Sequence, residues 1–199
     1  MGFDIYGIKP HNPQHLVKPE LDFTKDTTQE QKDEYFNRME HYERNVPGHY
    51  FRNNVWWWRP LWTYLCTYTD VLTSEQQDEG GSNSGAEVDD EQAIELATQL
   101  HKLIDSGHTA EHEQAHMREY ELAQIRNKEL EEARNVLHEV VIAETGDDSI
   151  IPANYPDSFK EDWDKLWEQK QWAGSYPFST DNIKEFANFC YGSGGFTIW

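Results

Sequence analysis

The residue types best suited to chemistry gather in one short segment, residues 108–116, with the sequence HTAEHEQAH. His108 and His112 fit the pattern H-x-x-E-H, and His112 and His116 fit H-E-x-x-H, two arrangements of zinc metalloproteases. Residues four apart share one face of a helix, so paired imidazoles could bind Zn²⁺ while Glu113 activates a zinc-bound water. The segment supports one hypothesis of activity: a zinc-dependent hydrolase with Glu113 as base and His108, His112 and His116 as ligands.

The surroundings of this segment favour a simpler interpretation. The region is rich in Glu and His, so short matches arise by chance, and no motif for a third ligand follows downstream. Asp105-Ser106-Gly107 ends one helix, and Thr109 is suited to cap the next, which would leave His108 outside the helix. We therefore expect exposed polar residues here, with no catalytic residue and no cofactor, and keep zinc as the alternative.

The elements around the histidines form a predicted helical hairpin over residues 92–143. Its first helix has an apolar stripe at Ala93, Leu96, Ala97, Leu100, Leu103 and Ile104. Its second helix, residues 110–143, has a heptad-like seam at Ala123, Leu130, Ala133, Leu137 and Val140. We expect the two helices to pack antiparallel. Because the second helix is longer, its overhang could offer a surface for a partner or for a homodimer.

Residues 50–62, with the sequence YFRNNVWWWRPLW, are the most distinctive stretch of the chain. Four tryptophans carry a large apolar area, so the segment is predicted to anchor the core. Asn54 is suited to cap a helix that starts there. Three consecutive tryptophans cannot all point inward on one helix. We therefore expect Trp56, Trp57 and Arg59 to take part in binding a protein.

Residues 73–91 differ from the rest of the chain in composition. They are rich in Asp, Glu, Gly and Ser and contain no basic residue, which predicts a flexible acidic loop. Glu87, Asp89 and Asp90 of this loop are candidate protein-binding residues.

The fold class that follows is mainly α, as a single domain over residues 1–199. Further helices are predicted at about 28–45, from Ser158, and from Thr180. The alternating patterns of Phe3–Tyr6 and Phe196–Trp199 predict short strands, which could pair and bring the N- and C-terminal segments together.

The charge of the chain limits its partners. The formal net charge is -20 over 199 residues, which disfavours direct contact with nucleic acid or with an anionic membrane, because both need clustered Lys and Arg. A basic partner is favoured, such as a nucleic-acid-binding protein. Cys66 and Cys190 form no metal or disulfide motif, and no membrane span or signal peptide is predicted.

Four segments together resemble a family of small uncharacterised proteins of tailed bacteriophages and prophages. They are residues 2–7 (GFDIYG), residues 48–62 (GHYFRNNVWWWRPLW), residues 103–110 (LIDSGHTA) and residues 181–196, which run from DNIKEFANFC to SGGF. The resemblance covers about half of the chain. It implies a phage accessory protein acting in the cytoplasm of the bacterial host, and it carries no catalytic residue or cofactor.

Three hypotheses of function follow. The first is an acidic accessory protein that binds and inhibits or modulates a host protein, such as a defence or DNA-binding protein, through DNA-like negative charge. The second is the zinc-dependent hydrolase on His112, Glu113 and His116. The third is a structural or assembly component that oligomerises through the long helix.

Overall fold

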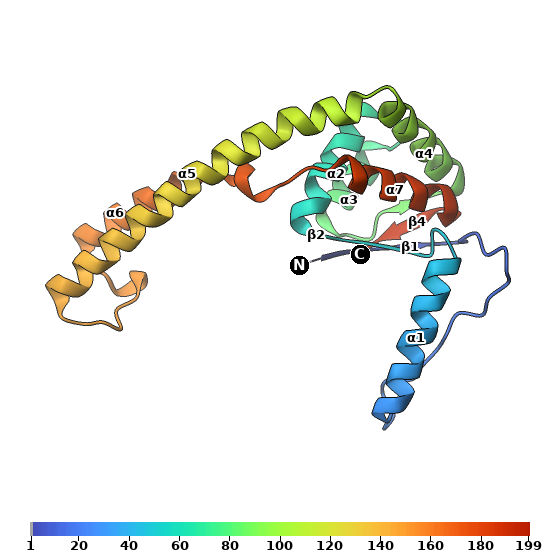
Figure 1. Ribbon diagram of the computed structural model, residues 1–199, viewed down its shortest axis with the longest axis horizontal. Coiled ribbons are helices and arrows are strands. Elements are labelled where there is room, and N and C mark those ends of the chain that lie inside the picture. Colours follow the sequence, from blue (N-terminus) through green and yellow to red (C-terminus); the bar gives the residue numbers. More distant parts are fainter. Residues whose placement is uncertain (1) are drawn as a thin grey trace. The chain divides into compact units, whose positions relative to one another are not determined.

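A computed structural model describes residues 2–199 and shows a mainly helical protein with one small antiparallel sheet (Figure 1). The elements in chain order are β1(Gly2–Gly7), α1(Gln29–Asn45), β2(Tyr50–Asn54), α2(Val55–Tyr68), α3(Ser74–Ser82), β3(Glu87–Val88), α4(Asp90–Asp105), α5(His108–Thr145), η1(Pro152–Asn154), α6(Asp157–Glu168), η2(Trp172–Ser175), α7(Thr180–Ser193) and β4(Phe196–Ile198). The single domain expected from the sequence is divided into two compact units. The first runs up to Glu113 and includes Phe178–Trp199, and the second is Gln114–Pro177.

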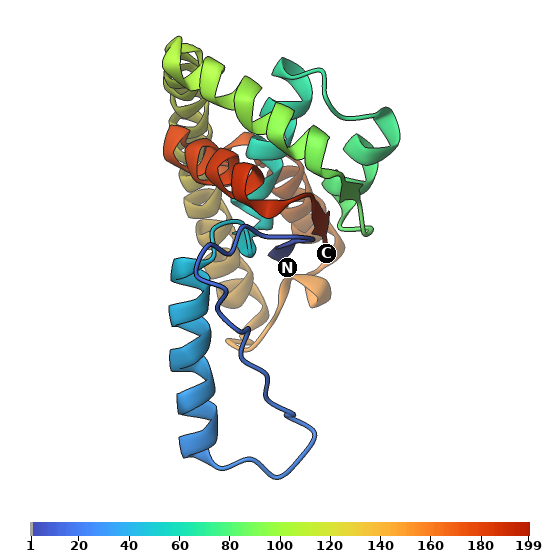
Figure 2. The ribbon, with the colours of Figure 1, turned by 90° about the vertical axis from the view of Figure 1, so that its right-hand side faces the viewer.

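The sheet of the first unit has the strand order β2-β1-β4-β3, with each neighbouring pair antiparallel. Ile5 of β1 is aligned with Phe51 of β2 on one side and with Ile198 of β4 on the other. The segments at the two ends of the described chain are therefore paired in the middle of the sheet. Helices α2, α3, α4 and α7 all lie on one side of it (Figures 1 and 2).

Helix α2 supplies the centre of the core. The side chain of Asn54 caps it, accepting hydrogen bonds from the N–H groups of Trp56 (3.0 Å) and Trp57 (3.2 Å). This cap sets the phase of the helix, so that Trp58 points inward and is fully buried. Its indole stacks on Phe3 and on Trp62, with ring centroids 5.3 and 5.1 Å away. The predicted anchoring role is confirmed for Trp58 and Trp62.

The prediction of a loop over residues 73–91 is wrong for most of that range, because α3 and β3 form there. The side chain of Thr73 caps α3, and two carbonyl groups of α3 accept indole N–H groups: Gln77 from Trp62 (2.8 Å) and Gly80 from Trp58 (2.9 Å). The helix contains no large apolar residue, so no amphipathic pattern in the sequence predicted it. Contacts with buried indoles hold it in place.

The predicted hairpin packing is also not what the structure shows. The apolar face of α4, with Ala93, Leu96, Ala97 and Leu100, is buried in the same core as Ile183, Phe186, Ala187 and Cys190 of α7. Helix α4 therefore packs against α7, which lies far away in sequence. The turn at Ser106-Gly107 between α4 and α5 was predicted correctly, and Gly107 has a positive φ of 83°.

In the second unit, α5 packs against the segment that contains α6 and η2. Ala123, Leu130 and Val141 are buried, whereas Ala133 and Val140 of the predicted seam are exposed. The backbone N–H and carbonyl of Gln171 both bond the side chain of Asn127, each at 2.8 Å. The guanidinium of Arg134 lies over the rings of Trp163 (5.6 Å) and Trp167 (4.8 Å). The seam predicted on α5 therefore packs against α6. Arg134 and Val141 lie at the contact positions that were predicted for Ala133 and Val140.

Candidate functional site: the open face of the sheet

The side chains of the sheet alternate between a buried face and an open face. Phe3 and Ile5 of β1 are buried against the helices, and so are Phe196 and Ile198 of β4. Asp4 and Tyr6 lie between the buried residues of β1 and therefore point to the opposite side, because successive side chains of a strand alternate. Helices α2, α3, α4 and α7 lie on the other side, whereas α1 lies on this side and extends away from the sheet in Figures 1 and 2.

The strand register arranges the open face in two rows. Asp4 is aligned with Arg52 and exchanges two backbone hydrogen bonds with Trp199 (2.8 and 2.9 Å). Tyr6 is aligned with Tyr50 on β2 and with Thr197 on β4. Thr197 is in turn aligned with Glu87 on β3. The open face consists of Arg52, Asp4 and Trp199 in one row and of Tyr50, Tyr6, Thr197 and Glu87 in the other.

Polar contacts fix the β2 side of this face. The hydroxyl of Tyr50 donates a hydrogen bond to Asp4 at 2.5 Å, and the guanidinium of Arg52 lies 3.5 Å from the same carboxylate. Partial burial and the neighbouring Asp4 raise the pKa of the Tyr50 hydroxyl, so it stays a protonated donor. The rings of Tyr6 and Tyr50 lie 5.1 Å apart. Asp4 therefore has two partners, and its charge is largely balanced within the face.

Two aromatic side chains of the open face are available for contact. Tyr6 is 41% exposed and Trp199 is 57% exposed. Gly85, with φ of 87°, brings the chain before β3 close to the ring of Trp199, 3.3 Å from where a Cβ would lie. Aromatic side chains with limited rotamer freedom are the preferred anchors of protein interfaces, so these two rings are the strongest candidates for binding.

The β3 edge of the sheet is acidic. Glu87 is exposed, and Asp89 and Asp90 follow it at the start of α4. Together with Lys9 and Gly194 they line a hollow of about 450 Å³. Asp89 also caps α4 by accepting the N–H of Gln92 at 2.8 Å. The structure thus brings together the three acidic residues predicted to bind a protein, and it assigns Asp89 a structural role as well.

The other predicted binding residues lie at the opposite edge of the sheet. Trp56, Trp57 and Arg59 belong to the first turns of α2, directly after the edge strand β2. Trp56 is 42% exposed, and Trp57 is half-buried with its carbonyl accepting the side-chain amide of Asn182 at 3.4 Å. The two predicted groups are therefore separated by the open face. Tyr6, Tyr50 and Trp199 of the open face were not predicted as binding residues, although for Tyr6 and Trp199 the alternation of the two terminal segments was a usable signal.

The histidine segment has packing partners in the first unit. The ring of His108 lies 2.8 Å from the hydroxyl of Tyr64, which also bonds Thr109 at 2.9 Å. Thr109 is buried inside α5, so its predicted role as a cap is wrong. His112 contacts the ring of Phe178, with centroids 4.7 Å apart. These contacts join the start of α5 to α2 and to the segment before α7.

The proposed catalytic base and the last histidine each contact the backbone. Glu113 accepts the N–H of Thr180 at 3.0 Å, and the ring of His116 bonds the carbonyl of Tyr176 at 2.6 Å. Among residues 2–199, no three His, Cys, Asp or Glu side chains are placed to hold one metal ion. The donor set of the alternative zinc site is therefore not assembled in the described part of the chain.

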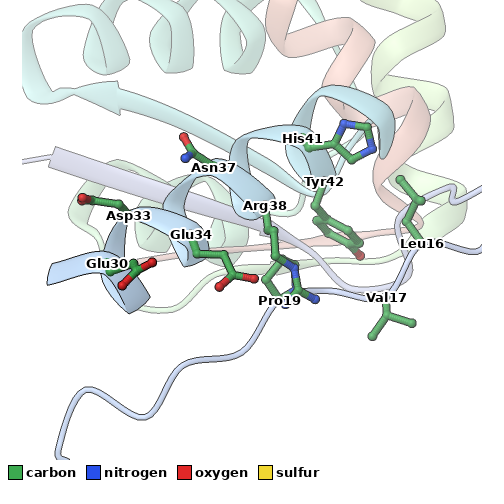
Figure 3. Close-up of a pocket in the computed structure, with 10 residues that line it drawn as sticks. All are labelled: Leu16, Val17, Pro19, Glu30, Asp33, Glu34, Asn37, Arg38, His41 and Tyr42. Atoms are coloured by element: carbon green, nitrogen blue, oxygen red, sulfur yellow. The ribbon is translucent and has the colours of Figure 1, made fainter. Parts of the chain in front are cut away.

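A larger hollow of about 710 Å³ lies between α1 and the segment 16–19 (Figure 3). Arg38 and Tyr42 point from α1 toward the segment that carries Leu16 and Pro19. Of the residues that line the hollow, only Pro19 and Tyr42 are buried, and the charged ones are exposed. Exposed charges on one helix give no desolvated acid or base, so this hollow has no arrangement for catalysis.

Comparisons with known proteins give no relative: no family model, no curated protein and no solved structure matches the chain. Within residues 2–199, no helix combines the length and apolar character needed to cross a membrane.

Proposed function

We propose that the protein acts by binding a basic protein through the open face of its sheet and the acidic β3 edge. The observation that carries the proposal is the combination of two exposed aromatic anchors, Tyr6 and Trp199, with the acidic side chains Glu87, Asp89 and Asp90 at one edge of the same sheet. Aromatic anchors supply most of the binding energy of such interfaces, and complementary charge speeds association.

A protein partner fits this surface better than a nucleic acid. Arg52 is the one basic side chain in the two rows of the open face, and Asp4 lies 3.5 Å from it. Stacking platforms for single strands combine aromatic rings with a positively charged groove, and the chain has a net charge of -20. Its acidity instead favours a partner with a basic surface, such as a nucleic-acid-binding protein whose groove would accept DNA-like charge.

The tryptophan segment resembles phage and prophage proteins, which implies that the partner is a protein of a bacterial host. A phage accessory protein would meet its partner in the cytoplasm of the bacterial host, where a defence or DNA-binding protein is a suitable target for inhibition. The alternative hydrolase gains no support, because Glu113 is bonded to the N–H at the start of α7 and His112 is packed on Phe178.

Affinity capture from bacterial lysate with the full tagged chain tests the proposal. The parent protein should retain a basic protein at low salt and release it progressively as salt is raised. Tyr6→Ala and Trp199→Ala should each weaken capture at least about tenfold, as expected for interface anchors. The matched control is Tyr191→Ala, since Tyr191 is 71% exposed on α7, away from the sheet.

The contribution of the acidic edge can be separated from that of the rings. The double variant Glu87→Lys/Asp90→Lys should reduce the salt dependence of capture, whereas Asp148→Lys/Asp164→Lys makes the same charge change at exposed positions of the second unit. Equal capture by all of these variants would show that the open face is not the binding surface.

A further inference from the structure

Helix α5 has an apolar stripe that the second unit leaves uncovered. Leu122 is 68% exposed, Ile125 59%, Val136 61% and Val140 43%. We call these four residues the outer stripe. Their spacings of three, eleven and four residues keep them on one face, because three to four residues make one turn of an α-helix and eleven make three. Ala133 is exposed on the same face and fills the gap between them.

The outer stripe is distinct from the face that packs inside the unit. In the second unit, the buried residues of α5 are Ala123, Leu130 and Val141, one position after Leu122, Glu129 and Val140. One residue is a rotation of about 100° around the helix axis. The helix therefore carries two apolar faces side by side, one for α6 and one with no cover from the described residues of the unit.

Charge is distributed unevenly along the part of α5 that carries the outer stripe. From Gln114 to Lys128 the basic residues are Arg118, Arg126 and Lys128 and the acidic ones are Glu119 and Glu121, a net charge of +1. From Glu129 to Thr145 the acidic residues are Glu129, Glu131, Glu132, Glu139 and Glu144 and the basic one is Arg134, a net charge of -4. The N-terminal half is thus positive relative to the C-terminal half.

We propose that the outer stripe is a dimer seam, in which α5 pairs antiparallel with α5 of a second copy of this chain. Two apolar stripes facing each other exclude water from both. Antiparallel pairing sets the positive half of each helix against the negative half of the other, whereas parallel pairing would set the two negative halves together. A second copy also supplies a stripe of the same length, about 27 Å from Leu122 to Val140 at a rise of 1.5 Å per residue.

The middle of the seam contains Glu129, and its charge is balanced within the helix. Arg126 lies 3.0 Å from Glu129 on the same chain. At the ends, antiparallel overlap centred between residues 129 and 131 sets Arg118 near Val140 and Glu144 of the partner. These opposite charges at the rim select the antiparallel orientation. The proposal is independent of the proposed function, since it uses no residue of the sheet.

Light scattering and sedimentation of the full chain test the dimer. The parent protein should be a dimer at micromolar concentrations, and Leu122→Glu or Val136→Glu should raise the dissociation constant at least about tenfold, as loss of an interface anchor does. The control is Asn135→Glu, which adds the same charge at an exposed position about 120° from the centre of each apolar face. Circular dichroism confirms that each variant is folded. A monomeric parent, or a dimer equally stable in all variants, overturns the proposal.

Cross-linking tests the orientation separately. A chain with Ala115→Cys is mixed with a chain with Ala143→Cys, which keeps the rim charges, and a short bis-maleimide is added, with the parent chain as control for Cys66 and Cys190. The antiparallel seam predicts a mixed dimer and little cross-linking of Ala115→Cys with itself, because those two positions would be more than about 30 Å apart. Cross-linking of Ala115→Cys with itself in preference to the mixed pair would overturn the antiparallel seam.

Discussion

The carboxylate of Glu113 accepts a hydrogen bond from the backbone N–H of Thr180, at 3.0 Å. Thr180 is the first residue of α7, whose N-cap is Ser179. A negative charge near the start of a helix satisfies an unbonded N–H and interacts favourably with the helix dipole. The residue that sequence analysis offered as a catalytic base thus stabilises the start of α7.

Replacing Glu113 should therefore destabilise the fold. Glu113→Ala removes the acceptor and the charge and should lower the free energy of unfolding by about 1 kcal/mol. Urea denaturation followed by circular dichroism measures the change. Glu119→Ala is the control, because Glu119 is exposed on α5 and lies beyond its first turns. Equal stability of the two variants would argue against the capping role.

The two glycines at the end of α3 should respond in opposite ways to alanine. A Cβ on Gly80 would lie 2.2 Å from the ring of the buried Trp62, whereas a Cβ on Gly81 would lie 3.6 Å from it, an ordinary contact. Gly80→Ala should destabilise the protein by about 1–3 kcal/mol through overpacking. Gly81→Ala should be neutral or stabilise it by up to about 1 kcal/mol, because alanine favours helix. Thermal unfolding of both variants provides the comparison, and a destabilisation shared by both would contradict it.

Gly107 and Gly48 both have a positive φ, but only Gly48 lies close to another backbone segment. Replacing each by alanine therefore distinguishes the cost of backbone strain from the cost of a steric clash. Gly107 has φ of 83° and open space around the position of a Cβ, so Gly107→Ala should cost only about 1–2 kcal/mol of left-handed strain. Gly48 has φ of 77°, and a Cβ there would lie 2.1 Å from the carbonyl carbon of Gly192. Gly48→Ala should cost about 3 kcal/mol or more, since two backbone segments must move apart. Chemical denaturation measures the loss of stability in each variant. Equal losses in the two variants would show that the positive φ alone sets the cost.

His49 should make stability depend on pH. Its ring is buried against Tyr42, and burial, followed by the charge of Lys18, lowers its pKa below the ordinary value of 6.5. The unfolded chain binds a proton at about pH 6.5, and the folded chain binds it only at lower pH. The free energy of unfolding should therefore fall as pH decreases from 6.5 toward the folded pKa.

The variant His49→Phe keeps a ring against Tyr42 and cannot titrate. Its stability relative to the parent should rise as pH is lowered from about 7.5 to 5, measured by urea denaturation at each pH. A difference that stays constant across this range would show that His49 does not titrate between the folded and unfolded states.

The parts of the fold that the sequence predicted are those with local signals. Asn54 caps a helix as predicted, and Gly107 has the left-handed conformation expected of a residue that follows a helix. Such signals depend only on neighbouring residues, so they can be read without a tertiary structure. The two strand segments at the ends were likewise visible from their alternation.

The parts that were missed depend on distant contacts. Helix α3 is stabilised by the indoles of Trp58 and Trp62, and nothing within residues 73–91 reveals this. The periodicity of α5 showed that the helix has an apolar face, and it could not show that α6 is the partner or that the face is displaced by one residue to Arg134 and Val141. The open face was missed because Tyr50 and Arg52 lie in a segment dominated by tryptophan, which concealed strand β2.

The central place of β1 and β4 in the sheet has a consequence for biosynthesis. Trp58 contacts Phe186 of α7, and Ile5 is aligned with Ile198, so the core around β1 and α2 is completed by residues more than a hundred positions later in the sequence. Pairings of such high sequence separation form slowly. On the ribosome, the aromatic side chains of α2 must therefore remain without these partners until nearly all of the residues described here have been synthesised, and exposed apolar surface of this kind is prone to aggregation.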